Sequence, residues 1–394
     1  MRASESSSKD ISAQQSQMMY ELIATTVRGL EEIAINEVEE LVGVKAERDT
    51  LTTVGGQGRI KFKADEKAIF TLNYCSNSLH RVIILLNYGE FSTLQEIYEA
   101  TKEIDFAKFI GEEQTFAVVA SRFATQGSHD FTSLDVASQV GQGVIDSFSE
   151  STGKRLKVNL KHPDVVISAG VVDNRFWIGI DTTGESLHKR KYRVYQHPAP
   201  LKASIAYAMV RISAWKSHEK FIDPFCGSGT IPIEAARYAC KMPNFLRDFL
   251  FWRLKFLPLD AFREEKERVD ERIEHKNLEI YGSDVSPKHV EGARMNADAA
   301  KVCVKFFEED ATKIKLDYDR IVANLPFGLR FGSPKKVAKL YKNFIQNLKE
   351  YHWKRAVLLT ASQKLHDLAV NYFKVRKMDI IYGKLPSFII ICER

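Results

Sequence analysis

The segment Asp223-Pro-Phe-Cys-Gly-Ser-Gly-Thr230 brings a carboxylate and two glycines together directly after the apolar pair Phe221-Ile222. Glycines let the backbone approach a ligand closely, and the helix expected next begins with N–H groups that lack a helical partner. A dinucleotide site would need a third glycine, and an ATP-binding loop would need a lysine after the glycines. The continuation Thr230-Ile231-Pro232 supplies neither. The segment therefore predicts a ligand-binding turn without a pyrophosphate cradle, or else a tight structural turn.

Two further acids follow the next two apolar stretches. The Asp284 carboxylate could accept two hydrogen bonds from a ribose diol; alternatively, Asp284 caps a helix that starts at Pro287. Asp310, followed by Ala311, could accept a hydrogen bond from an adenine amino group, although such an acid is also typical of a solvated loop. Because the carboxyl ends of strands in an open α/β sheet line one crevice, we expect both acids to share a site with the glycine turn.

The run Asn324-Leu325-Pro326-Phe327 follows a fourth apolar stretch and indicates the reaction. An exocyclic amine of a nucleobase is a poor nucleophile, because its lone pair is delocalised into the ring. The Asn324 side-chain oxygen and the Leu325 carbonyl could accept its two hydrogens and hold the nitrogen in line with a methyl donor, while Phe327 stacks on the base. The alternative is an ordinary Asn–Pro turn.

These segments need a framework that brings strand ends together. Short apolar strands are expected at residues 221–223, 278–284, 304–307, 320–323 and 356–360, with helices between them, and residues 373–380 and 388–392 predict a closing hairpin. This alternation is typical of an α/β, doubly wound and mostly parallel sheet, here seven-stranded. An insertion at residues 242–277 carries a charged run over residues 263–276, with pairs such as Glu264–Arg268, and is expected to be a solvated helix face.

The N-terminal half follows a different pattern. Residues 1–18 are rich in Ser and Gln and are expected to be a flexible tail. Strands and helices over residues 19–74 and 75–184 predict two α+β units, with a hairpin turning at Asp173-Asn174. A basic linker at residues 185–205 then leads into the α/β domain at residues 206–394.

Composition narrows the class of protein. Apolar residues make up 44% and charged residues 27% of the 394 residues, as in globular proteins. The net charge of +6 permits nucleic-acid binding without requiring it. No apolar run approaches a membrane span, and the five scattered cysteines fit a reducing compartment better than a disulfide scaffold or a zinc site. We therefore expect a cytoplasmic protein with no membrane partner and no metal.

Taken together, the motifs resemble those of class I S-adenosylmethionine-dependent methyltransferases that modify exocyclic amines. Their motif is Asn/Asp-Pro-Pro-Tyr/Phe; Leu325 replaces the first proline, which keeps the carbonyl but costs the loop some rigidity. Asp223 to Thr230, Asn324 to Arg330 and the linker segment His188 to Lys202 resemble one subfamily, the THUMP-domain RNA guanine-N2 methyltransferases. The resemblance covers residues 19–394. It implies a Rossmann-like class I methyltransferase domain preceded by ferredoxin-like and THUMP domains.

The resemblance also implies a role for each matching residue. Asn324 would touch the donor and orient the target amine, and Leu325, Pro326 and Phe327 would complete the catalytic loop. The cofactor would be S-adenosyl-L-methionine, bound by His197, Pro198, Ala199, Pro200, Leu201, Asp223, Cys226, Gly227, Ser228, Asp284, Asp310, Ala311 and Asn324. Within this set Asp223 would position the methionine amino group, and Cys226 would be a small buried residue rather than a nucleophile.

The expected partner is tRNA, with no obligatory protein partner. Within the subfamily, the chain most resembles the tRNA enzymes that methylate guanosine 6 of the acceptor stem. Ribosomal-RNA enzymes, tRNA enzymes acting at guanosine 10 and an RNA-binding module with a decayed site remain alternatives. Phosphate contacts are expected from two basic clusters: Lys189, Arg190, Arg193, Lys335 and Lys336. All expected cofactor residues lie in the C-terminal half. A fragment from about His188, expressed alone, is therefore expected to bind S-adenosylmethionine but not to methylate tRNA efficiently.

Overall fold

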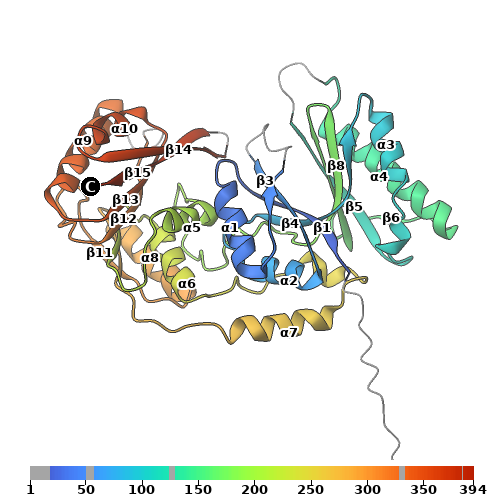
Figure 1. The fold of residues 1–394 in the computed structure, drawn as a ribbon, viewed down its shortest axis with the longest axis horizontal. Coiled ribbons are helices and arrows are strands. Elements are labelled where there is room, and N and C mark those ends of the chain that lie inside the picture. Colours follow the sequence, from blue (N-terminus) through green and yellow to red (C-terminus); the bar gives the residue numbers. More distant parts are fainter. Residues whose placement is uncertain (1–17, 50–56, 124–128, 328–332, 384) are drawn as a thin grey trace, which may run out of the picture.

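The computed structural model describes residues 18–49, 57–123, 129–327, 333–383 and 385–394. They form an eight-stranded sheet in the N-terminal half and a seven-stranded sheet in the C-terminal half, each packed against helices (Figure 1). The expected tail up to residue 17, and Gly328, Leu329 and Arg330 of the catalytic motif, lie outside the described residues. Within the described ranges, no helix has the length and apolar character that crossing a membrane requires.

The N-terminal sheet has the strand order β2-β3-β1-β4-β8-β7-β5-β6. Its strands are β1 (Tyr20–Val27), β2 (Glu47–Arg48), β3 (Gln57–Ala64), β4 (Arg81–Glu90), β5 (Thr115–Phe123), β6 (Lys157–Val158), β7 (Val165–Val172) and β8 (Arg175–Asp181). Its helices are α1 (Glu31–Val42), α2 (Glu66–Cys75), α3 (Leu94–Lys102), the 3₁₀ helix η2 (Phe106–Lys108) and α4 (Ser133–Thr152). Because β4 pairs with both β1 and β8, the two expected α+β units share one sheet and one core.

Local signals set several of these elements. The Asp65 side chain accepts a 2.9 Å hydrogen bond from the Ala68 N–H and so begins α2. Thr132 begins α4 with a reciprocal capping box to Asp135. The β7–β8 hairpin turns at Asp173, which has a φ of 50°, so the hairpin expected there is confirmed.

The C-terminal sheet has the strand order β11-β10-β9-β12-β13-β15-β14. Its strands are β9 (Phe221–Asp223), β10 (Ile280–Asp284), β11 (Lys305–Glu308), β12 (Arg320–Asn324), β13 (Arg355–Thr360), β14 (Lys374–Tyr382) and β15 (Leu385–Glu393). The helices around it are α5 (Ala203–Ile212), α6 (Thr230–Ala239), α8 (Pro287–Ala299), α9 (Pro334–Glu350) and α10 (Gln363–Ala369).

The prediction of a mostly parallel sheet with a closing hairpin is confirmed. In the order of the sheet, β11, β10, β9, β12 and β13 pair in parallel. β15 and β14 then add an antiparallel hairpin at the edge beside β13. Phe221 and Ile222 of β9 are both fully buried, one in the core on each face of the sheet. Burial on both faces is the reason why parallel strands read as continuous apolar runs.

The insertion between β9 and β10 departs from expectation. It contains the 3₁₀ helix η3 (Leu250–Arg253) and helix α7 (Leu259–Asp270), which lies next to α2 along the lower edge of Figure 1. Phe249 and Phe251 at η3 are buried in the N-terminal core. Phe262 and Val269 of α7 are buried in the same core, so α7 is not merely a solvated helix face. The few apolar residues in and beside the charged run form a stripe on α7 that packs into the N-terminal core.

The ion pairs of α7 differ in the same way. Glu265 is buried, accepting a 2.9 Å hydrogen bond from Thr71 of α2 and pairing with Arg268. The expected Glu264–Arg268 pair is not the one formed, because Glu264 faces Lys67 of α2 at 4.0 Å. Charged residues of the insertion therefore contact α2 of the N-terminal half as well as one another.

A second contact joins the halves at the closing hairpin. The Ile381 N–H of β14 donates a 3.1 Å hydrogen bond to the Arg28 carbonyl at the end of β1. Gly29, with a φ of 93°, lies so close that a Cβ there would be 2.2 Å from the Asp379 carbonyl oxygen. Val27 and Leu30 are buried in the C-terminal core. The halves therefore exchange core residues in both directions.

We predict that a fragment of residues 188–394 will aggregate or unfold, contrary to the expectation from sequence. Truncation exposes Phe249, Phe251 and Phe262, each of which contributes about 1.5–3 kcal/mol when buried. Size-exclusion chromatography and circular dichroism of the fragment, beside the full chain, measure this. A monomeric, folded fragment that binds S-adenosylmethionine would contradict it.

Candidate active site

The residues expected to bind the donor and the target lie at one edge of the C-terminal sheet. Asp223 ends β9 and pairs in register with Gly282 of β10, and Asp284 ends β10 beside Glu308 of β11. Asn324 ends β12, the strand on the other side of β9. The structure thus brings together, at the carboxyl ends of parallel strands, the residues that the sequence separates by up to a hundred positions.

The glycine turn is held against β10. The Cys226 N–H donates to the Ser283 carbonyl at 2.9 Å, and the Gly227 N–H donates to Asp284 Oδ2 at 3.0 Å. Gly229, with a φ of 78°, begins α6, and a Cβ there would be 2.8 Å from Phe306. Only glycine combines that backbone angle with so close an approach.

Asp284 is held by backbone N–H groups on both sides, although it is not the N-cap of α8, which is Ser286. Its Oδ1 accepts a 2.9 Å hydrogen bond from the Ser286 N–H before α8, and its Oδ2 accepts from Gly227. The His289 Nδ1 lies 3.4 Å from Oδ1. A carboxylate has about four acceptor positions, so the fixed oxygens can each accept a further hydrogen bond from a hydroxyl.

Asp223 and Cys226 are buried, and no cation of the described residues is among the causes that shift their pKa values. The Asp223 carboxylate accepts a 3.0 Å hydrogen bond from the Phe225 N–H. Burial raises the pKa of Asp223 well above its ordinary value, and the charge of Asp284 adds to this. An ammonium group placed beside Asp223 would favour its ionised form. Burial also raises the pKa of Cys226, which keeps it a thiol and agrees with a packing role.

The linker lies over the glycine turn. His197 accepts a 3.0 Å hydrogen bond from the Ala199 N–H, and its ring packs edge-on against His289 at 4.4 Å between centroids. A Cβ on Gly227 would be 3.5 Å from His197 Nε2. The residues Pro198, Ala199 and Pro200 are exposed. Beyond them Leu201 is buried, and the Pro200 carbonyl accepts from the Tyr382 hydroxyl at 2.9 Å.

A residue that sequence reasoning missed couples the linker to the turn. Asn296 of α8 accepts a 2.8 Å hydrogen bond from the Tyr195 N–H and donates at 3.0 Å to the carbonyl of Ser228. It lies between Ala293 and Ala297, which are both buried. An asparagine on the apolar stripe of a predicted helix was the signal that could have identified it.

The loop after β11 is also ordered by hydrogen bonds. Asp310 Oδ1 accepts from the Thr312 N–H and hydroxyl at 2.9 and 2.8 Å. Burial alone would raise the pKa of Asp310, but these hydrogen bonds and Lys313 lower it. Ala311 is buried, and its carbonyl accepts a 3.0 Å hydrogen bond from Asn347 of α9. Asp310 is therefore charged. Its Oδ1 accepts the hydrogen bonds of the turn, whereas its second carboxylate oxygen takes no part in them.

The described part of the loop after β12 contains an unsatisfied side-chain acceptor. The side-chain oxygen of Asn324 is buried and has no hydrogen-bond partner within the described part of the chain. Buried polar atoms are nearly always paired, so this oxygen is available for a ligand donor. Phe327 beside it is half-buried.

Leu325 makes a contact that proline could not. Its N–H donates a 3.1 Å hydrogen bond to the Leu359 carbonyl of β13, and its side chain is fully buried. Proline has no N–H, so the departure from the family motif replaces ring rigidity with an anchor to the sheet. The Pro326 carbonyl is held in turn by the Tyr341 hydroxyl at 2.7 Å.

Two of the five residues expected to contact RNA are committed elsewhere. Arg190 is buried and forms a bidentate pair with Glu234 of α6, with both nitrogen–oxygen distances 3.0 Å, so its predicted phosphate contact is wrong. Arg193 is half-buried and donates to the Leu201 carbonyl, which holds the linker in place. The basic run in the sequence hid this difference, because burial depends on contacts with α6 that are distant in the chain.

The other three basic residues are exposed. Lys189 pairs with Glu185 at 3.6 Å across an exposed surface. Lys335 and Lys336 lie exposed in the first turn of α9, which follows the catalytic loop. These three remain candidates for contact with RNA phosphates.

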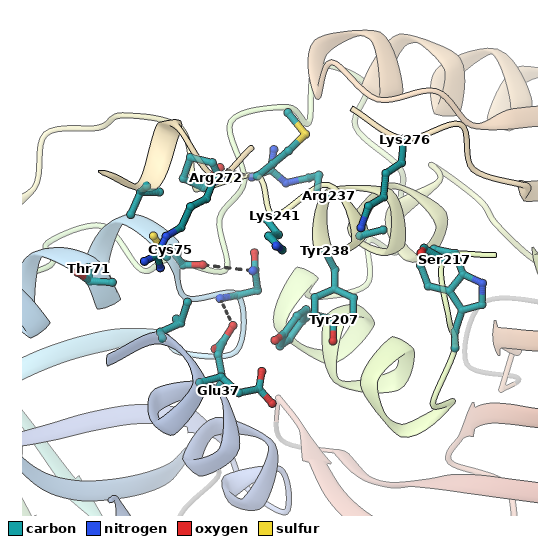
Figure 2. A pocket seen from close by; sticks show the side chains of 18 of the residues that line it. Glu37, Thr71, Cys75, Tyr207, Ser217, Arg237, Tyr238, Lys241, Arg272 and Lys276 are labelled. Atoms are coloured by element: carbon teal, nitrogen blue, oxygen red, sulfur yellow. Dashed lines mark hydrogen bonds between the residues drawn. The ribbon is translucent and has the colours of Figure 1, made fainter. Parts of the chain in front are cut away.

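A cavity of about 660 Å³ lies away from this site (Figure 2). Its lining includes Glu37 of α1, Thr71 of α2, Tyr207 of α5 and Arg237 at the end of α6. Because α6 has ten residues, Arg237 is about 10 Å or more from the glycine turn at the start of that helix. The cavity therefore lies between the two halves, not at the strand ends. No motif in the sequence indicated it, since its lining comes from separate elements.

Among the described residues, no group of three or more His, Cys, Asp and Glu side chains could hold a metal ion. The donor set at the strand ends fits a nucleoside-bearing ligand instead. It offers carboxylates for hydroxyl, ammonium and amino groups, a glycine turn for close approach, and the unpartnered Asn324 oxygen.

Comparison with known proteins agrees with this arrangement. The model of the RMKL-like methyltransferase domain matches residues 190–388, that of the THUMP domain residues 91–181, and that of the RlmL ferredoxin-like domain residues 21–83. A solved structure described as a possible methylase from Clostridium difficile superposes with a TM-score of 0.84 at 25% identity, covering 95% of this chain and 98% of its own.

Two archaeal relatives are more similar in sequence. The tRNA (guanine(6)-N2)-methyltransferase of Archaeoglobus fulgidus is 41% identical over 88% of this chain and 85% of its own length. The enzyme of the same name from Methanocaldococcus jannaschii is 38% identical over 91% of this chain and 96% of its own length. With the fold, the strand-end site and these matches, the chain belongs to the family of THUMP-domain methyltransferases that includes the archaeal tRNA (guanine(6)-N2)-methyltransferases.

Proposed function

We propose that this chain transfers a methyl group from S-adenosyl-L-methionine to the exocyclic N2 amine of guanosine 6 in tRNA. The proposal extends to this chain the reaction that the names of its two archaeal relatives state. It also implies a cytoplasmic protein, since that is where archaeal and bacterial tRNA is modified. The observation that carries it is the buried, unpartnered Asn324 oxygen at the end of β12.

The donor would lie across the strand ends. Asp223 would accept from the methionine ammonium group, Asp284 from the ribose hydroxyls and Asp310 from the adenine amine. His197 and the linker residues after it would cover the ligand, since the His197 ring already lies beside Gly227. When bound, S-adenosylmethionine supplies an electrophilic methyl group on its sulfur.

The catalytic loop would orient the target. Asn324 Oδ1 and the Leu325 carbonyl would accept hydrogen bonds from the two N–H groups of guanine N2. This favours a pyramidal nitrogen whose lone pair is localised and faces the donor instead of being delocalised into the ring. Because both acceptors are fixed before the reaction, they stabilise the amine as it becomes tetrahedral without reorganising. Phe327 would stack on the guanine ring.

The rest of the RNA would be held by the N-terminal half and by Lys189, Lys335 and Lys336. Exposing a paired guanine costs a few kcal/mol, which contacts elsewhere on the RNA offset. The shared core between the halves fixes the distance between an RNA contact on one half and the catalytic loop on the other.

The direct test is mass spectrometry of nucleosides from a tRNA transcript incubated with the protein and isotope-labelled donor. We expect labelled N2-methylguanosine that maps to position 6. A matched transcript with an adenosine at position 6 and a compensating pairing base should stay unlabelled. Ribosomal-RNA fragments are incubated in parallel. Label in the adenosine transcript, label in the ribosomal-RNA fragments but not in tRNA, or no label in any of these RNAs would overturn the proposed reaction.

Substituting Asp284→Ala is expected to remove most of the donor affinity. Two charge-assisted hydrogen bonds to the ribose are worth roughly 2–3 kcal/mol, which is about two decades in the dissociation constant. Calorimetric titration with S-adenosylmethionine measures the loss. Glu291→Ala, which removes an exposed acid from the neighbouring helix α8, is the control. Equal affinity in both variants would leave Asp284 only its contacts to Gly227 and Ser286.

Substituting Asn324→Ala is expected to slow methyl transfer far more than it weakens donor or tRNA binding. Loss of one transition-state hydrogen bond typically costs on the order of a hundredfold in rate. Asn324→Asp keeps an acceptor oxygen and should retain more activity than alanine. Single-turnover rates at saturating donor and tRNA measure both variants. A full rate in the alanine variant would refute the role of the side chain.

A further inference from the structure

Tyr341 of α9 connects the helix to the catalytic loop. Its side chain is fully buried in the core between the sheet and α9. Its hydroxyl lies 2.7 Å from the Pro326 carbonyl oxygen and 3.2 Å from the Thr360 hydroxyl at the end of β13. No motif in the sequence singled out Tyr341 or Thr360.

The direction of these hydrogen bonds follows from counting protons. The Pro326 carbonyl only accepts, so the single Tyr341 proton is donated to it. The Thr360 hydroxyl must then donate to the Tyr341 oxygen, and it accepts in turn from the Ser362 N–H at 3.0 Å. Burial raises the pKa of Tyr341, so the phenol keeps the proton that this chain of hydrogen bonds needs.

This chain of hydrogen bonds fixes the loop on the C-terminal side of the Leu325 carbonyl, at the Pro326 carbonyl. On the other side, the Leu325 N–H is held by Leu359, the neighbour of Thr360 on β13. Between these two anchors lies the Leu325 carbonyl. A peptide group is planar, so fixing the N–H before it and the carbonyl after it restricts the direction in which this carbonyl points.

We propose that Tyr341, oriented by Thr360, is a positioning residue that aims the Leu325 carbonyl at the target amine. The inference rests on the proposed function, in which that carbonyl is one of two acceptors. It also gives a reason why the loop works with leucine in place of the first proline. The rigidity that the ring would provide comes from β13 and α9 instead.

A purely structural role makes a different prediction. If the Tyr341 hydroxyl only satisfies a buried carbonyl, its loss lowers the melting temperature and leaves the rate of the folded enzyme unchanged. If it aims the loop, its loss slows methyl transfer while the donor still binds normally, because the proposed donor contacts other than Asn324 lie on other segments.

The test compares Tyr341→Phe with Tyr318→Phe, both of which remove one hydroxyl and keep the ring. Tyr318 lies before β12 and packs on Tyr281, away from the catalytic loop. We expect Tyr341→Phe to lower the single-turnover rate about three- to tenfold, the effect of one hydrogen bond, with an unchanged donor dissociation constant. Tyr318→Phe should keep the rate of the unmodified chain.

Thr360→Val keeps the shape of the side chain and removes the hydroxyl that orients Tyr341. It should lower the rate by itself, but add little in the Tyr341→Phe background, since the two groups act as one unit. Additive effects of the two changes, or a Tyr341→Phe rate equal to that of the unmodified chain, would overturn the inference while leaving the proposed function intact. Failure of the unmodified chain to methylate guanine N2 would overturn both.

Discussion

The buried ion pair between Arg190 and Glu234 is the interaction on which the site depends. Both side chains are 1% exposed, and Tyr192 donates a further 2.8 Å hydrogen bond to Glu234. Burial alone would raise the pKa of Glu234, but Arg190 lowers it and keeps the acid charged. Arg190 also donates to Asn77, so one guanidinium joins the linker, α6 and the N-terminal half. Removing either partner would leave a buried charge unpaired, at a cost of roughly 3–5 kcal/mol.

Within the described residues, this fixed frame leaves a site in which most polar groups are satisfied, and the buried side-chain oxygens of Ser283 and Asn324 are not. The glycine turn, Asp284, the Asp310 turn and the loop after Asn324 are each held by hydrogen bonds of 2.7–3.0 Å. Such preorganisation lowers the cost of ordering the site when ligands bind. Under the proposed function, the substrate brings the partner of the Asn324 oxygen, and this acceptor favours a donor such as an amine.

Sequence patterns predicted the catalytic half well, because its strands are continuous apolar runs and its functional residues directly follow them. They failed where contacts connect distant segments. Arg190 read as part of an exposed basic run, yet it packs against α6, and the apolar residues of α7 were hidden among charges. Tyr341 and Asn296 contact backbone atoms of other loops. The place of Asn296 on an apolar helix stripe marks it as unusual, but no local spacing shows which loop either residue contacts.

In the proposed function, Asn324 holds the target amine. A structure of the protein with S-adenosylhomocysteine and a guanosine-6 acceptor-stem RNA is the most direct test of this role. We expect guanine N2 to lie about 2.7–3.2 Å from Asn324 Oδ1, the range of an N–H···O hydrogen bond, with the base stacked on Phe327. A guanine whose N2 is held by other residues, while the Asn324 oxygen faces away from it, would contradict the account.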